Sequence, residues 1–312
     1  MLLALLLAAL PAVYWTQPVS SAPALKEAGV TRVLVPPERV EEWKAAGVDA
    51  APISDAELES RVVLRTPGIR GRADVASATH RPWIDTNGWR IQRSGGRERY
   101  RYRPVAGKAA LSAAEAYAWG ADAVVAVEPA ELGSLGGMLA FLAGLPAADL
   151  PGIADVGIED DGSALVGEVL NLAACRNLLI RPDRDAAGVA LQVKIGTTEF
   201  PRSEALNPDA FSLLLRRRLG EGRRSLHLYG SEVVLARLTG DGQRLRLQLV
   251  NYGGRSVEGL RVRLRGAWAP VGVWLSGQGK GEVEDYARRD GTTELSLATV
   301  DTYGLIDLAA AP

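Results

Sequence analysis

The sequence predicts an α/β protein in which an irregular or incomplete (β/α) barrel precedes a small antiparallel, immunoglobulin-like β-sandwich. Short apolar strands alternate with helices through most of the chain, and from Ser225 onward the hydrophobic pattern changes to a period of two. A doubly wound sheet is the alternative, but no glycine-rich dinucleotide fingerprint follows the first strand. The predicted organisation is a leader over 1–12, a barrel-like domain over 13–224 and a sandwich over 225–312.

Composition excludes several classes of protein. The 312 residues carry 36 Lys+Arg and 37 Asp+Glu, a net charge of −1, and 47% of them are hydrophobic. These values exclude a disordered chain and a polytopic membrane protein, and they argue against a nucleic-acid partner. The single cysteine, Cys175, excludes an internal disulfide and a cysteine-rich zinc site, and we expect it to be an inert core thiol. We expect no metal and no cofactor.

The first residues form an apolar run of Leu and Ala that ends in Pro11-Ala12. This pattern is typical of a short secretory signal with cleavage after Ala12, and the run is too short to span a bilayer. It predicts a periplasmic or secreted protein without an integral membrane span. The alternative is that residues 1–12 belong to a buried first strand, in which case the protein is cytoplasmic.

Strand and helix then alternate in order. Two successive helices end in an Ala-Gly-Val triplet, whose glycines, Gly29 and Gly47, suit a left-handed helix end followed directly by a parallel strand. Ser54 and Glu57 form a capping box at the start of the third helix. The predicted helices are 23–29, 38–46 and 55–60, and the predicted strands are 31–35, 48–53 and 62–64.

The pattern loosens over 66–104, where two extended pieces, 83–85 and 89–93, and a strictly alternating segment, 97–103, are expected. Regular alternation then resumes. Helices are predicted over 109–119, 130–143, 163–174 and 209–219, and strands over 123–127, 156–158, 177–180 and 189–195.

The sandwich is predicted from strict alternation. Leu247 and Leu249 point to one side of their strand and Arg246 and Gln248 to the other, which indicates one buried face and one wet face. Glycine-rich turns separate seven expected strands: 226–229, 233–238, 245–251, 260–264, 271–275, 294–297 and 304–308.

In a barrel the functional site lies at the carboxyl ends of the strands. Glu128 follows the most apolar predicted strand, so we expect it to be a general acid or base. The alternative is a structural role, since a Glu before Pro at a helix start is stabilised by the helix dipole alone.

The segment 83–90 (Trp-Ile-Asp-Thr-Asn-Gly-Trp-Arg) places two indole rings around a carboxylate and an amide. Indole rings can stack on a pyranose while Asp and Asn bind its hydroxyls. The alternative is an Asn-Gly turn whose Trp rings pack in the core. Adding the end of the first predicted strand, the ligand-contacting candidates are Trp15, Gln17, Trp83, Asn87 and Trp89, and Asp85 is the candidate carboxylate.

A β/α barrel followed by a small β-sandwich resembles the layout of many secreted glycoside hydrolases. The resemblance concerns architecture, the Trp-Asp-Asn-Trp segment and Glu128. It implies a carbohydrate or other small polar ligand and a pair of carboxylates, Glu128 as acid/base and Asp85 as its partner. Two hypotheses follow: an exported carbohydrate-active hydrolase, or a catalytically inactive barrel that binds a glycan or another protein.

Overall fold

The structure, a computed structural model, describes residues 10–70, 83–183 and 188–311. The chain divides into two compact units. The first takes the chain up to Gly68 together with Ser94–Asp149, and the second takes Ile69–Arg93 together with Leu150–Pro312. Residues 1–9 of the predicted leader lie outside the described residues.

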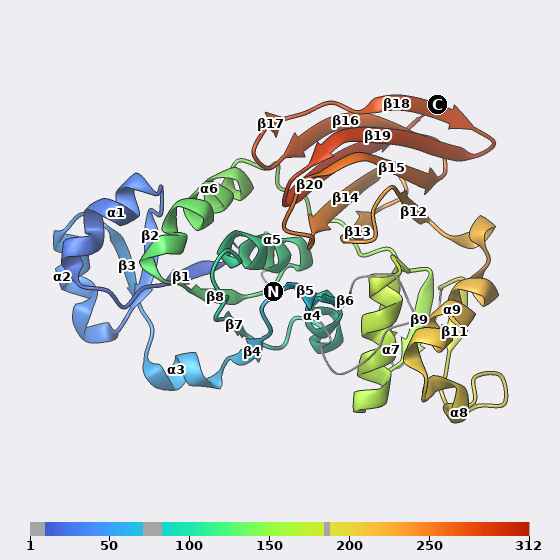
Figure 1. Cartoon of the computed structure of the whole chain (residues 1–312), viewed down its shortest axis with the longest axis horizontal. Helices are drawn as coiled ribbons and strands as arrows, with labels where there is room; N and C mark the ends of the chain where they lie inside the picture. Colours follow the sequence, from blue (N-terminus) through green and yellow to red (C-terminus); the bar gives the residue numbers. More distant parts are fainter. Residues whose placement is uncertain (1–9, 71–82, 184–187, 312) are drawn as a thin grey trace, which may run out of the picture. The chain divides into compact units, whose positions relative to one another are not determined.

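The first unit is built on a six-stranded parallel sheet in the order β3-β2-β1-β8-β7-β4 (Figure 1). The first strand lies beside a late one, β8, as in a closing barrel, while β3 and β4 stand at opposite edges although they are consecutive strands. The sheet is therefore an open, incomplete barrel. Its strands are β1 (Ala12–Tyr14), β2 (Arg32–Val35), β3 (Asp49–Pro52), β4 (Val62–Leu64), β7 (Tyr100–Tyr102) and β8 (Ala123–Ala126).

The helices of this unit begin and end where local signals predict. Gly29 and Gly47 have φ angles of 72° and 75°, which confirms the left-handed helix ends. Ser54 Oγ accepts from the Glu57 N–H at 3.1 Å, which confirms the cap. The helices are α1 (Ala22–Glu27), α2 (Val40–Ala45), α3 (Asp55–Ser60), α5 (Ala109–Trp119) and α6 (Leu132–Ala143).

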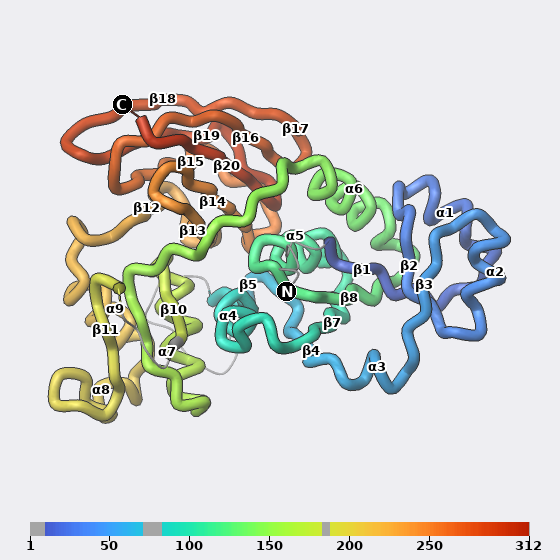
Figure 2. The backbone as a smooth tube through the Cα atoms, turned by 180° about the vertical axis from the view of Figure 1, so that it is seen from behind, coloured from blue at the N-terminus to red at the C-terminus, as the bar shows by residue number. Residues whose placement is uncertain are grey.

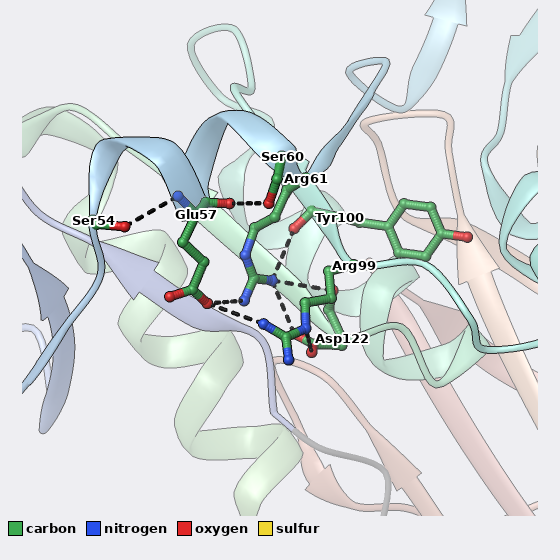
Figure 3. A network of polar contacts seen from close by, with 7 residues as sticks. All are labelled: Ser54, Glu57, Ser60, Arg61, Arg99, Tyr100 and Asp122. Carbon is green, nitrogen blue, oxygen red and sulfur yellow. Dashed lines mark hydrogen bonds and ion pairs between the residues drawn. The ribbon is translucent and has the colours of Figure 1, made fainter.

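A buried arginine joins the amino ends of three strands (Figure 3). Arg61, 7% exposed, donates to Asp122 Oδ1 at 2.9 Å, to the Tyr100 carbonyl at 3.4 Å and to Glu57 Oε1 at 3.5 Å. Arg99 reaches the same two carboxylates, Glu57 at 3.2 Å and Asp122 at 3.6 Å, from an exposed position. The two arginines share partners and differ in burial.

Arg61→Ala is expected to lower the free energy of unfolding by about 2–3 kcal/mol, because it removes a buried side chain and its bond to the buried Tyr100 carbonyl, while the two carboxylates keep only their exposed ion pairs to Arg99. Arg99→Ala is the matched control, and its exposed ion pairs contribute less than about 1 kcal/mol. Urea unfolding of both variants measures the difference. Equal stability of the two variants would contradict the role of burial.

The second unit contains a smaller α/β portion. A two-stranded sheet, β5 (Gly68–Arg70) with β6 (Trp83–Asp85), precedes a parallel three-stranded sheet in the order β10-β9-β11. Figure 2 shows β5, β10 and β11 from behind. Its core contains Val156, Ile158, Val169, Phe200 and Phe211. The remaining elements are β9 (Val156–Glu159), β10 (Ile180–Asp183), β11 (Leu191–Val193), α7 (Ala164–Cys175), α8 (Arg202–Ala205) and α9 (Pro208–Leu219).

One element differs in type from its prediction. Residues 89–93 were expected to be extended, but they lie in helix α4 (Gly88–Ser94). The Asn87 carbonyl accepts from the N–H groups of Arg90 and Ile91, which starts the helix. Trp89 and Ile91 are both buried, although residues two apart lie on nearly opposite faces of a helix, so α4 is covered on more than one side. The segment 89–93 is too short for its residue pattern to distinguish a strand from a helix.

Two antiparallel sheets complete the second unit, in the orders β12-β15-β19-β18 and β13-β14-β20-β16-β17. Leucines and valines from their inner faces form one core. The predicted fold class, an incomplete barrel followed by a sandwich, is confirmed. The strands are β12 (Leu226–Tyr229), β13 (Val234–Gly240), β14 (Arg244–Asn251), β15 (Val257–Arg265), β16 (Trp268–Leu275), β17 (Gly279–Lys280), β18 (Glu284–Arg289), β19 (Thr292–Val300) and β20 (Tyr303–Ala310).

The predicted wet face of β14 is wrong. Arg246 and Gln248 are only 7% and 6% exposed. Arg246 makes two 2.7 Å bonds to the Asp307 carboxylate, and the Tyr303 hydroxyl donates to Gln248 at 2.7 Å. These partners satisfy the polar groups, so alternation along β14 marks two buried faces.

Cys175 closes α7, and its thiol donates weakly to the Ile84 carbonyl at 3.7 Å. Burial raises the pKa of this thiol to about 12. We therefore expect the folded protein to react with a thiol-specific disulfide reagent at least about a hundredfold more slowly than free cysteine at pH 8, and at the normal rate in denaturant. Rapid reaction of the native protein would contradict this.

No helix among the described residues is both long enough and apolar enough to cross a membrane.

Candidate functional site

The carboxyl edge of the six-stranded sheet gathers acidic side chains from several loops. Glu128 lies two residues after β8, at the start of the short 3-10 helix Pro129–Glu131, and it is exposed. Its side chain makes no capping hydrogen bond to that helix. Glu128 is therefore positioned as predicted, at the end of an apolar strand and open to solvent.

Tyr14 is the last residue of β1, and the charged residues near it at this edge affect the pKa of its phenol. Burial raises the pKa of its phenol, negative charge on Asp55 and Glu38 raises it further, and Arg103 opposes the shift. These three charged residues follow β3, β2 and β7 respectively. The edge thus places a phenol and a guanidinium among carboxylates.

Sequence reasoning missed Tyr14, Glu38 and Asp55. The predicted strand ends at 35, and Glu38 lies three residues beyond it, at the start of the predicted helix 38–46. Sequence reasoning treated Asp55 only as a helix-start residue. Because parallel strands present all their carboxyl ends at one edge, every polar residue within a few positions of a strand end was a candidate.

Trp15 and Gln17 also follow β1, but they differ in exposure. Trp15 is fully buried, and its indole N–H donates to Ser21 Oγ at 3.0 Å. Gln17 is half-buried, and its carbonyl accepts from Arg39 at 3.0 Å. The Trp15 ring is therefore part of the core of the first unit.

The four other predicted site residues lie in the second unit. Trp83 is half-buried, whereas Asn87 is fully buried and Trp89 is 6% exposed. Asp85 is half-buried and faces Arg70 across the two-stranded sheet, with 3.7 Å between charged atoms. The burial of Asn87 and Trp89 therefore agrees with the alternative that the segment 83–90 is a structural turn whose side chains pack in the core.

Trp89 packs tightly where it is. The guanidinium of Arg90 lies 4.1 Å from its ring centroid and that of Arg93 lies 5.9 Å away. A Cβ at Gly167 of α7 would stand 3.1 Å from the ring. Glycine at that position lets the helix approach the indole closely.

Glu128, Trp15 and Gln17 thus belong to the first unit, and Asp85, Trp83, Asn87 and Trp89 to the second. Their roles in catalysis and ligand binding stay predictions. Within the part of the chain that the structure describes, no group of three His, Cys, Asp or Glu side chains is arranged to hold a metal ion.

No protein-family profile matches the sequence, and no curated protein sequence matches it. Among solved structures, an alpha-L-fucosidase isoenzyme 2 from Paenibacillus thiaminolyticus is similar with a TM-score of 0.57 and 8% identity, over 94% of this chain and 80% of that one. A GH42 beta-galactosidase from G. stearothermophilus has a TM-score of 0.45 and 9% identity, over 87% and 65%. A rhamnosidase from Novosphingobium sp. PP1Y has a TM-score of 0.42 and 11% identity, over 88% and 38%.

The similarity to the fucosidase shows the fold: this chain resembles a glycoside hydrolase in architecture, with a parallel α/β portion followed by antiparallel sheets. At 8% identity it shows nothing beyond the fold. This chain spans less than two thirds of the galactosidase and of the rhamnosidase.

Proposed function

We propose that the protein acts on carbohydrate and that the sugar binds at the carboxyl edge of the six-stranded sheet. The observation that carries this proposal is the position of Tyr14, Glu38 and Asp55 at or just after the carboxyl ends of β1, β2 and β3, the edge of the sheet where Glu128 also stands. Carboxylates and a phenol are suitable partners for sugar hydroxyls. The fold, which resembles a fucosidase, commonly carries its site at this edge.

Glu128 would act as the general acid/base of glycoside hydrolysis. Its carboxyl group is exposed, so a substrate oxygen can reach it without rearrangement of the core. The reaction needs a second carboxylate about 5–10 Å away, as nucleophile or as the base that activates water. Asp85 is the partner proposed from the sequence, and Asp55, on the same edge as Glu128, is a second candidate.

Ligand contact would then fall to side chains that retain exposed surface. In the first unit these are Gln17 and Tyr14. Trp15 would support that site from within the core of the first unit, because its side chain is buried. In the second unit, Trp83 of the segment 83–90 retains exposed surface, whereas Asn87 and Trp89 are buried.

Glycan binding without turnover is the second candidate function. It is favoured by the ion pair between Asp85 and Arg70, which occupies the proposed catalytic partner, and by the burial of Trp15 and Trp89. An inactive barrel of this kind would keep the edge of the sheet as a binding surface for a glycan or a protein.

Export is part of the proposal, and β1 makes it testable. Ala12 pairs with Val124, so cleavage after Ala12 would remove only the first residue of β1 and leave Val13 and Tyr14 in the sheet. The intact mass of protein recovered from a bacterial periplasm would show a new N-terminus at Val13. Uncleaved protein retained in the cytoplasm would contradict export.

The experiment that tests the function is a screen of purified protein against a glycan array and a panel of chromogenic glycosides. Cleavage of a glycoside supports hydrolysis, and binding without cleavage supports the second candidate. Neither binding nor cleavage would contradict both.

A further inference from the structure

The sheet β12-β15-β19-β18 (Figure 1) carries several exposed arginines on its outer face. Leu260, Val262 and Leu264 of β15 point into the sandwich core, so the alternate residues point outward. Those residues are Arg261, Arg263 and Arg265. Alternate positions on a strand are about 7 Å apart, so the three guanidinium groups are spread over about 14 Å.

The register across the sheet defines what stands beside these arginines. Arg263 pairs with Glu294 of β19, and Glu294 pairs with Ala287 of β18. Because Ala287 is small, the face is hollowed there, with a volume of about 420 Å³. The hollow is lined by Arg261, Arg263, Ala287, Arg289, Asp290, Thr292 and Glu294, and Arg265 lies outside it on the same face.

The arginines of this face differ in whether they form an ion pair with a carboxylate of the chain. Glu294 is shared by Arg261 and Arg263, the latter at 3.7 Å. Arg265 and Arg289 flank Thr292 on the two neighbouring strands. Neither of these two has a carboxylate within ion-pairing distance among the residues that the structure describes. The guanidinium groups of Arg265 and Arg289 therefore lie on the same face of the sheet, on either side of Thr292, where they can bind an anion together.

An aromatic side chain borders the same face. Tyr229 of β12 pairs with Arg261 and is 44% exposed. Its ring is stacked on that of His227, with centroids 6.0 Å apart and planes at 5°. A fixed ring beside guanidinium groups can pack against the apolar face of a sugar.

We infer that this outer face binds an acidic polysaccharide, with sugar carboxylates held by Arg265 and Arg289 and a ring packed on Tyr229. The span of the arginines suits an oligosaccharide rather than a single small anion. Duplex DNA carries one charge about every 1.7 Å, a higher density than the few arginines of this face can match, which disfavours it. The proposal extends beyond the proposed function and does not depend on Glu128.

Polygalacturonate is the probe, and its binding is measured by calorimetry at low salt. The double variant Arg265→Gln/Arg289→Gln is expected to bind at least about tenfold more weakly, with unchanged thermal stability, because neither arginine holds a carboxylate of the chain. Arg217→Gln, an exposed arginine of α9, is the matched control and should bind as the wild type does. Glu128→Gln should also bind normally, which separates this surface from the proposed catalytic site.

Tyr229→Leu distinguishes a saccharide from any polyanion. It should weaken binding of polygalacturonate several-fold and leave binding of polyglutamate, which has no sugar ring, unchanged. The inference is overturned if the double arginine variant binds polygalacturonate as the wild type does. It is also overturned if polyglutamate or duplex DNA binds more tightly than polygalacturonate.

Discussion

Gly136→Ala is expected to destabilise the first unit by about 3 kcal/mol or more. Gly136 lies in α6, where a Cβ would stand 1.7 Å from the Ala28 carbonyl oxygen and 3.3 Å from Val30. The first contact is with the backbone at the end of α1, which cannot move aside as a flexible side chain can. Either α6 shifts away from α1 or the end of α1 distorts, and both lose packing.

Gly137→Ala is the matched control in the next position of the same helix. No atom lies within 4 Å of a Cβ placed there. This variant should gain about 0.5–1 kcal/mol, because alanine has the higher helix propensity. Urea unfolding of both variants gives the comparison, with opposite signs expected. Equal stability of the two variants would mean that α6 does not approach α1 as described.

Glu128→Gln is expected to lower kcat on any glycoside that the protein cleaves by about 10²–10⁴-fold. The change keeps the size and hydrogen-bonding reach of the side chain and removes only the exchangeable acidic proton. Binding of the same glycoside should therefore change little. The measurement is steady-state kinetics combined with equilibrium binding of the uncleaved substrate.

Glu27→Gln supplies the control for Glu128. Glu27 is an exposed glutamate at the end of α1, and it precedes the amino end of β2 rather than following the carboxyl end of a strand. It should leave both kcat and binding unchanged. A Glu128 variant that retains full activity would remove Glu128 from the mechanism and leave Asp55 and Glu38 as the acids of the edge.

Much of the fold could be predicted because local signals and packing agree. Gly29 and Gly47 need a left-handed backbone, which few other residues adopt, so their sequence context indicated the helix ends. The leucines of β14 alternate strictly and form the sandwich core. Such consistency between local preference and tertiary packing makes an element predictable from sequence.

The failures share a different cause. Strand β18 was not predicted because almost all its residues are exposed, so they form no hydrophobic pattern. The strand is defined by its backbone pairing with β19. Arg246 was placed on a wet face because its partner Asp307 is distant in sequence. The hydrophobic period of a sequence does not reveal ion-pair or strand partners that are distant along the chain.

In the candidate site, too, features set by the local sequence could be predicted and features set by tertiary packing could not. The position of Glu128 just after an apolar strand could be predicted from the sequence, and its catalytic role stays a prediction. Trp15 also follows a strand, but its burial depends on Ser21 and on the helices that cover that side of the sheet. Tyr14, one residue earlier, points to the opposite side, so the residue that retains exposed surface was one position away from the residue chosen.

The central claim is that the carboxyl edge around Glu128 acts on sugar, and one comparison tests it most directly. The glycan array and glycoside panel are applied in parallel to the wild type, Glu128→Gln and Glu27→Gln. The account predicts that the wild type and Glu27→Gln cleave the same glycoside and that Glu128→Gln binds it without cleaving it. Absence of binding and cleavage in the wild type, or equal cleavage by Glu128→Gln, would contradict it.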